Sequence, residues 1–149
     1  MTIITRALVR LNAQAASKED AIQQAGALLV ENGRVAASYV DGMLAREQTM
    51  STYLGNGIAI PHGQFDNRAD IFQTGISVVQ FPAGIEWEEG ESAYLVIGIA
   101  ATADEHIGVL ANLSQVLEDE ADAQLLIRAE DPMLIVERLG RPAAVEEES

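Results

Sequence analysis

The run Ile58-Ala59-Ile60-Pro61-His62-Gly63 contains the residue of this chain that is best placed to do chemistry. Its three apolar residues are typical of a strand, and Pro61 ends that strand or places it at an edge, because proline donates no hydrogen bond to a sheet. Gly63 frees the backbone to turn and leaves room for a large group to approach. The pattern predicts a nucleophilic His62 presented at a strand end. The alternative is a loop histidine that only bonds the backbone.

His106 is the second of the two histidines. It falls in the first turn of a helix expected to open at Asp104, on the apolar side of that helix. The positive end of a helix dipole disfavours an imidazolium, so the ring should stay neutral. A partly buried packing histidine and a functional one both fit this position.

Other kinds of site find little support in the sequence. The chain has no cysteine, which removes thiolate zinc sites and cysteine nucleophiles. It also lacks a G-x-S-x-G elbow, a phosphate-binding loop, a dinucleotide fingerprint and an HExxH pair. We therefore expect neither a metal nor a cofactor. A histidine that reacts covalently without a nucleotide suggests a relay between proteins.

The net charge of −14, from 23 acidic and 9 basic residues, argues against binding to nucleic acid or to an anionic membrane surface. It favours basic protein partners, or it only keeps the protein in solution. The longest apolar run, residues 94–103, is far shorter than the roughly 20 residues that span a bilayer. No secretory signal is evident, so a cytoplasmic location is expected.

The length and the 48% hydrophobic content suit one domain, which is predicted over residues 1–141. Residues 142–149 are predicted to form an acidic disordered tail or linker. The natural chain is expected to continue after this linker. Helices are predicted from Ser17 as N-cap, from Ser38 toward Met50, and from Asp131 as N-cap to Gly140. Strands are predicted at 52–54, 58–60, 75–81 and 94–100. Pro82 is expected to stop the third strand, and Trp87 to lie in an acidic loop.

A wider pattern surrounds His62. Glu47, then Leu54-Gly55, then residues 58–63 match the signature of the fructose/mannitol class of enzyme IIA, a component of the bacterial phosphoenolpyruvate-dependent sugar phosphotransferase system. Further blocks in family order are residues 39–47, 73–75, 97–101 and 105–107. The chain resembles this family over roughly residues 1–140, and most of all the domain that begins fructose-specific diphosphoryl transfer proteins.

The resemblance implies an α/β (α+β mixed) fold, with a central mixed β-sheet flanked by helices on both faces. It implies a phosphotransferase component in which His62 is the phosphorylated histidine, Arg46 a neighbouring arginine and His106 the second active-site histidine. His62 would attack through Nε2, with its other ring nitrogen held by a backbone carbonyl. Gln64 stands where relatives often carry threonine, which puts in doubt a hydroxyl contact to the phosphoryl group there.

The implied partners are HPr or an HPr-like domain as phosphoryl donor and enzyme IIB of a fructose (or mannitol) permease as acceptor. The membrane would be met only through that permease. Two alternatives stay open: a nitrogen-related regulatory enzyme IIA, and a non-catalytic acidic protein-binding module. Without the resemblance, Arg46 would be taken for a surface helix residue paired with Glu47 or another acid.

Overall fold

The computed structural model describes residues 3–63, 69–102 and 106–140. In chain order the elements are a 3₁₀ turn η1 (Arg6–Leu8), β1 (Val9–Arg10), α1 (Lys18–Glu31), α2 (Ser38–Thr49), β2 (Tyr53–Gly55), β3 (Ile58–Ala59), β4 (Gly75–Glu88), β5 (Glu91–Ala100), α3 (His106–Glu118), α4 (Glu120–Ile127) and α5 (Pro132–Leu139).

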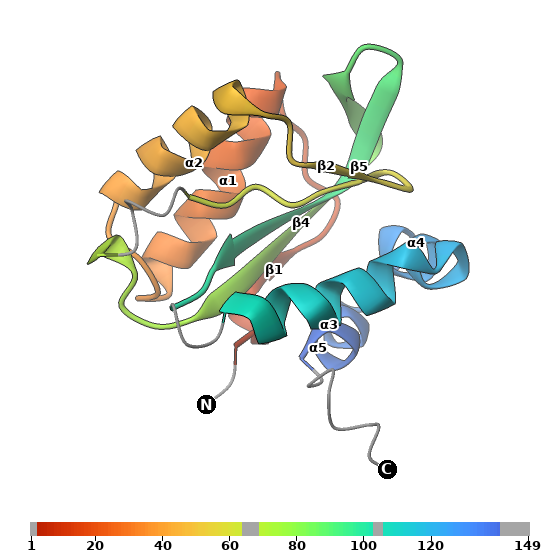
Figure 1. The fold of residues 1–149 in the computed structure, drawn as a ribbon. Helices are drawn as coiled ribbons and strands as arrows, with labels where there is room; N and C mark the ends of the chain where they lie inside the picture. The colour runs from red at the N-terminus through yellow and green to blue at the C-terminus, as the bar shows by residue number, and fades with distance from the viewer. Residues whose placement is uncertain (1–2, 64–68, 103–105, 141–149) are drawn as a thin grey trace.

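The strands form one mixed five-stranded sheet in the order β1-β4-β5-β3-β2. β4 and β5 pair antiparallel, β1 runs parallel to β4, and β3 runs parallel to β5. α1 and α2 cover one face, and α3, α4 and α5 lie on the other (Figure 1). The central strand β5 is buried from Leu95 to Ala100, as expected where helices cover both faces. The predicted fold class is confirmed.

Helix ends follow the capping residues of the sequence. The Ser17 hydroxyl accepts a hydrogen bond of 3.1 Å from the Asp20 N–H at the start of α1. Asp131 caps α5 in the same way, Pro132 is its first residue, and Gly140 follows its last. These short-range predictions are confirmed.

The prediction that Pro82 stops a strand is wrong. β4 continues through it to Glu88, and its pairing with β5 shifts register between Gln80 and Ile85. Pro82 lies inside this irregular stretch, where residues 81–84 have no register partner on β5, so its missing N–H interrupts no regular ladder pair. Gly84, at φ +81, takes up the bend.

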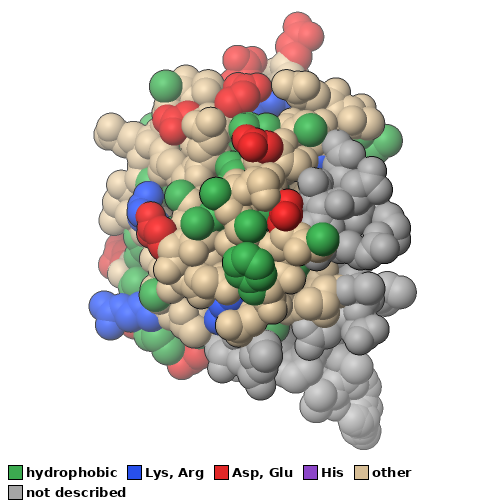
Figure 2. All heavy atoms as spheres, turned by 90° about the vertical axis from the view of Figure 1, so that its left-hand side faces the viewer, with side chains coloured by type: hydrophobic (Ala, Val, Ile, Leu, Met, Phe, Trp, Pro, Cys, Tyr) green, Lys and Arg blue, Asp and Glu red, His purple; other side chains and the backbone are tan. Residues whose placement is uncertain are grey.

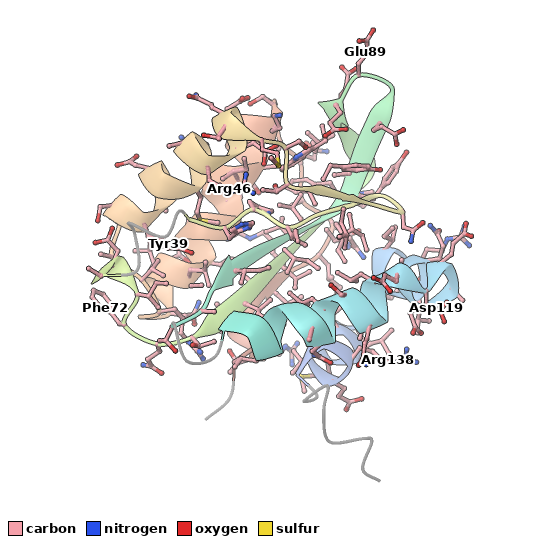
Figure 3. The ribbon with its side chains drawn as sticks, viewed as in Figure 1. Tyr39, Arg46, Phe72, Glu89, Asp119 and Arg138 are labelled. Atoms are coloured by element: carbon pink, nitrogen blue, oxygen red, sulfur yellow. The ribbon has the colours of Figure 1, made fainter. Side chains whose placement is uncertain are left out.

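The acidic stretch predicted as a loop is the end of a long hairpin that rises beyond the sheet (Figure 1), with Glu89 at its tip (Figure 3). Trp87 belongs to β4, and its side chain is only 3% exposed. The short helix α4, which begins after the cap Asp119, was not predicted. Asp104, where a helix was expected to open, Gln64 and the tail at 142–149 lie outside the described residues.

Among the described residues, no helix has both the length and the apolar content needed to cross a membrane.

Candidate active site

The backbone around His62 is fastened to the central strand. β3 pairs with β5 through Ile58 with Leu95 and Ala59 with Val96. After Pro61 the same register resumes, because His62 forms a parallel bridge with Ile99, and the Ile99 N–H donates to the Pro61 carbonyl at 3.0 Å. The expectation of a histidine at a strand end is confirmed, and a buried strand supports it.

The His62 ring is half-buried, and its Nδ1 lies 2.9 Å from the carbonyl oxygen of Ile60. A carbonyl oxygen only accepts hydrogen bonds, so Nδ1 is assigned the hydrogen. In the neutral ring the lone pair then belongs to Nε2. This contact orients the imidazole and selects the tautomer in which Nε2 is the nucleophilic nitrogen.

Tyr39, which sequence reasoning missed, holds the backbone on the far side of His62. Its hydroxyl donates to the Ile99 carbonyl at 2.8 Å and accepts from the Gly63 N–H at 2.9 Å. Burial raises the pKa of Tyr39, and the hydrogen bond from Gly63 opposes part of that rise. The side chain, 3% exposed, is therefore a neutral phenol at ordinary pH.

Gly63 is needed for a different reason than the sequence suggested. Its φ is not positive, so no unusual backbone conformation requires glycine. A Cβ added there would lie 2.6 Å from Cε1 of Tyr39. The space that glycine leaves open is filled by the tyrosine ring, so the expectation that a large group approaches there is wrong on this side of the chain.

Arg46 lies on α2 seven residues after Tyr39, which is about two helical turns and therefore the same side of the helix. Figure 3 shows both labelled side chains on the side of α2 that faces the segment carrying β2 and β3. Arg46 as a whole is half-buried, and its Nη1 donates to the Met50 carbonyl at 2.7 Å in a solvent-exposed hydrogen bond. Arg46 thus belongs to the helix that also contacts Gly63.

His106 is the first residue of α3, and its side chain lies outside what the structure describes. Its backbone follows the carboxyl end of β5, the end at which Ile99 meets His62. The structure therefore places the two histidine backbones at the same end of the sheet. In the described part of the chain, no group of three or more His, Asp or Glu could hold a metal ion.

Comparison with known proteins shows the family of this chain. Residues 2–141 match the family model described as "Phosphoenolpyruvate-dependent sugar phosphotransferase system, EIIA 2". The chain belongs to this family. It is a type-2 enzyme IIA, a phosphotransferase component of the fructose/mannitol class.

The enzyme IIA domain is 57% identical to the "Multiphosphoryl transfer protein" of Salmonella typhimurium over 113 residues, 76% of this chain and 30% of that protein. It is 40% identical to the "Mannitol-specific phosphotransferase enzyme IIA component" of Bacillus subtilis, over 87% of this chain and 90% of that one. The chain thus spans about a third of the length of the first of these relatives and nearly all of the second.

A solved structure agrees with the fold. The enzyme IIA of the Escherichia coli complex of enzyme IIA-mannitol with phosphorylated enzyme IIB-mannitol superposes with a TM-score of 0.84 at 40% identity, covering 91% of this chain and 96% of that one. At this identity the likeness extends beyond the fold to the class of enzyme IIA.

A buried carboxylate supports the C-terminal end of α2 in this enzyme IIA. Glu47 is 6% exposed and accepts hydrogen bonds from the Thr52 N–H at 3.1 Å, the Thr52 hydroxyl at 2.5 Å and the Trp87 indole at 3.0 Å. Lys18 completes the set at 3.3 Å. Glu47 is therefore an anchor joining α1, α2, β4 and the approach to β2, and its ion pair is with Lys18.

Sequence reasoning quoted Glu47 in the family signature but gave it no structural role. The one available signal was the signature itself, which begins at this acid and not at the histidine. The donors come from residues 5, 29 and 40 positions away, so no local pattern could identify them.

Some large apolar side chains of the described residues are exposed. Met50 follows α2 and is 65% exposed, and Phe72, which precedes β4, is 63% exposed. Phe72 projects at the left edge of Figure 3, and this side faces the viewer in Figure 2, where hydrophobic side chains gather among acidic ones.

Proposed function

We propose that His62 accepts a phosphoryl group from the phosphohistidine of HPr, or of an HPr-like domain, and passes it to enzyme IIB of a fructose permease. The single observation that carries the proposal is the Nδ1 contact with Ile60, which leaves Nε2 as the nucleophilic nitrogen within the family signature. Family membership supports the reaction class.

In the proposed step the lone pair of Nε2 attacks phosphorus while the bond to the donor histidine breaks. The phosphoryl group moves as a unit, so no water, metal or nucleotide is consumed. The attack leaves positive charge on the His62 ring, whose Nδ1–H keeps its hydrogen bond to the Ile60 carbonyl. That bond strengthens as charge develops, because hydrogen bonds to charged groups are stronger than neutral ones. Transfer of the phosphoryl group to enzyme IIB removes this positive charge from the His62 ring.

Arg46 is proposed to neutralise the phosphoryl oxygens. Its planar fork of N–H donors matches phosphate geometry. To reach the group, the guanidinium would exchange its bond to the Met50 carbonyl, which lies at an exposed position, for bonds to phosphate. His106 is proposed to donate one N–H to the same oxygens as a neutral ring, since it stands at a helix N-terminus.

The fructose branch is proposed over mannitol because the relatives named multiphosphoryl transfer proteins reach 57% identity, against 40% for the mannitol enzyme IIA of Bacillus subtilis. We further propose a cytoplasmic location, since phosphoenolpyruvate, the phosphoryl source of this system, is formed inside the cell.

The test is a reconstituted relay. The chain is incubated with phosphoenolpyruvate, enzyme I and HPr, and then with fructose-type or mannitol-type enzyme IIB. We expect one phosphoryl group on the wild-type chain, none on H62A, and faster delivery to the fructose-type acceptor. Phosphorylation of H62A would refute the assignment of His62, and faster delivery to the mannitol-type acceptor would refute the fructose branch.

A further inference from the structure

The Tyr39 hydroxyl bonds to both backbone groups that face each other across the sheet just after His62. In a parallel bridge between His62 and Ile99, the Ile99 N–H faces the Pro61 carbonyl, and the Ile99 carbonyl faces the Gly63 N–H. The first pair is bonded directly at 3.0 Å. Both members of the second pair also bond to the Tyr39 hydroxyl, which donates to the carbonyl at 2.8 Å and accepts from the N–H at 2.9 Å.

The backbone on both sides of His62 is thus fixed to one residue of the central strand. Before the histidine the Ile99 N–H bonds to the Pro61 carbonyl, and after it the Tyr39 phenol of α2 bonds to both the Gly63 N–H and the Ile99 carbonyl. We propose that Tyr39 is a positioning residue for phosphoryl transfer, which sets the direction of the His62 ring by tying the backbone groups of Gly63 and Ile99 to one buried hydroxyl. This inference rests on the proposed role of His62.

Tyr39 acts through the backbone and not on the phosphoryl group. Its single O–H is donated to Ile99, and one of its lone pairs is taken by Gly63. The buried ring stays protonated at working pH, so the donated bond persists throughout the reaction. Because phosphoryl transfer depends on positioning, a misplacement of about 1 Å costs on the order of a hundredfold in rate.

The packing of the ring is as specific as its hydrogen bonds. A Cβ on Gly63 would come within 2.6 Å of Cε1 and 2.9 Å of Cζ of Tyr39. The glycine after the histidine and the tyrosine on α2 are therefore one unit: the small residue admits the ring, and the ring supplies the hydroxyl. Replacing either Gly63 or Tyr39 would therefore shift the other residue from its present position.

Tyr53 provides a matched control within the same sheet. Its hydroxyl also donates to a backbone carbonyl, Ser92, and accepts from a glycine N–H, Gly57, both at 3.2 Å. It joins β2 to the hairpin and makes neither of the contacts that flank His62. Y53F removes the same chemistry as Y39F from a different place.

The experiment measures phosphoryl transfer from phospho-HPr to the full chain for wild type, Y39F and Y53F, together with the NMR signals of the His62 ring and the Gly63 amide. We expect Y39F to reduce the maximal rate roughly ten- to hundredfold, with an unchanged half-saturating concentration of phospho-HPr. Its ring signals should shift and its Gly63 amide should exchange faster. Y53F should match wild type in all of these.

Transfer by Y39F at the wild-type rate, or an unchanged His62 ring, would overturn the proposal and leave Tyr39 as a packing residue. If wild-type His62 takes no phosphate, the proposed function fails, and the NMR comparison still decides whether Tyr39 positions the ring.

Two further variants, G63A and Y39L, test the proposal if Y39F folds poorly. G63A should lower the transfer rate in the wild-type background and add no further loss to Y39L, where the ring no longer occupies that space. Independent losses in the double variant would refute the coupling of the two residues.

Discussion

The hydrogen bonds that Glu47 accepts allow a prediction of how much its replacement lowers the free energy of unfolding. Glu47→Ala leaves the Thr52 N–H and the Trp87 indole N–H without their acceptor, and both residues are buried. Each buried donor left unsatisfied costs about 1–3 kcal/mol, so we expect a loss of about 2–6 kcal/mol in the free energy of unfolding. Against a typical total of about 5–15 kcal/mol, this is a large fraction.

Glu47→Gln separates charge from shape. The Thr52 hydroxyl can turn to accept from an amide NH₂, while the remaining amide oxygen keeps the bonds from Trp87 and the Thr52 N–H. What is lost is the ion pair with Lys18, whose side chain is 25% exposed. We therefore expect a cost of about 1 kcal/mol or less for Glu47→Gln, because the Lys18 ammonium left behind can reach water. Lys18→Met should cost more, because it leaves the buried Glu47 carboxylate without its cation.

The assay is urea unfolding of wild type, E47A, E47Q and K18M, followed by circular dichroism and by the fluorescence of Trp87, the only tryptophan. The order expected is wild type, then E47Q, with K18M and E47A both below E47Q. If E47A unfolds within about 0.5 kcal/mol of E47Q, the buried hydrogen bonds do not carry the stability assigned to them.

Three further predictions follow from the site. Arg46→Gln should slow transfer to His62 roughly ten- to hundredfold, since hydrogen bonds to charged groups are worth about 1.5–3 kcal/mol. Arg46→Lys should recover only part of the rate, because lysine lacks the planar fork of donors. Equal rates for wild type and both variants in a single-turnover assay would remove Arg46 from the mechanism. His106→Ala should still be modified at His62 and relay roughly a hundred- to thousandfold more slowly, and wild-type rates in both directions would make it a packing residue. Burial raises the pKa of Tyr39 above its unfolded value of about 10. The contribution of the protonated phenol to stability is therefore complete below that pH and is lost as pH rises through the folded pKa. Unfolding of wild type should become easier above about pH 10, and the unfolding free energy of Y39F should depend less steeply on pH.

Much of this fold could be predicted because its signals are local. The cap Ser17, the Asp131-Pro132 start and the end at Gly140 each act within a few residues, and each is confirmed. The strand end at His62 was predictable for the same reason: the apolar run, the proline and the histidine are adjacent.

The failures come from interactions between distant parts of the chain. Pro82 is tolerated because the pairing of β4 with β5 shifts register around it, which no property of residues 80–85 reveals. Trp87 lies in an acidic stretch but is buried beneath Lys18 and Glu47, residues of two helices. Tyr39 reaches residues 24 and 60 positions away, so its part in the site becomes visible only when α2 is placed against the sheet.

The central claim is that Nε2 of His62 carries the phosphoryl group while Nδ1–H stays bonded to the Ile60 carbonyl. The most direct test is NMR of the ¹⁵N-histidine-labelled chain after incubation with phosphoenolpyruvate, enzyme I and HPr. We predict phosphorus coupling to Nε2 of His62 and a protonated Nδ1 that keeps its slowly exchanging hydrogen. Phosphorus on Nδ1, on His106 alone or on no histidine would contradict the account.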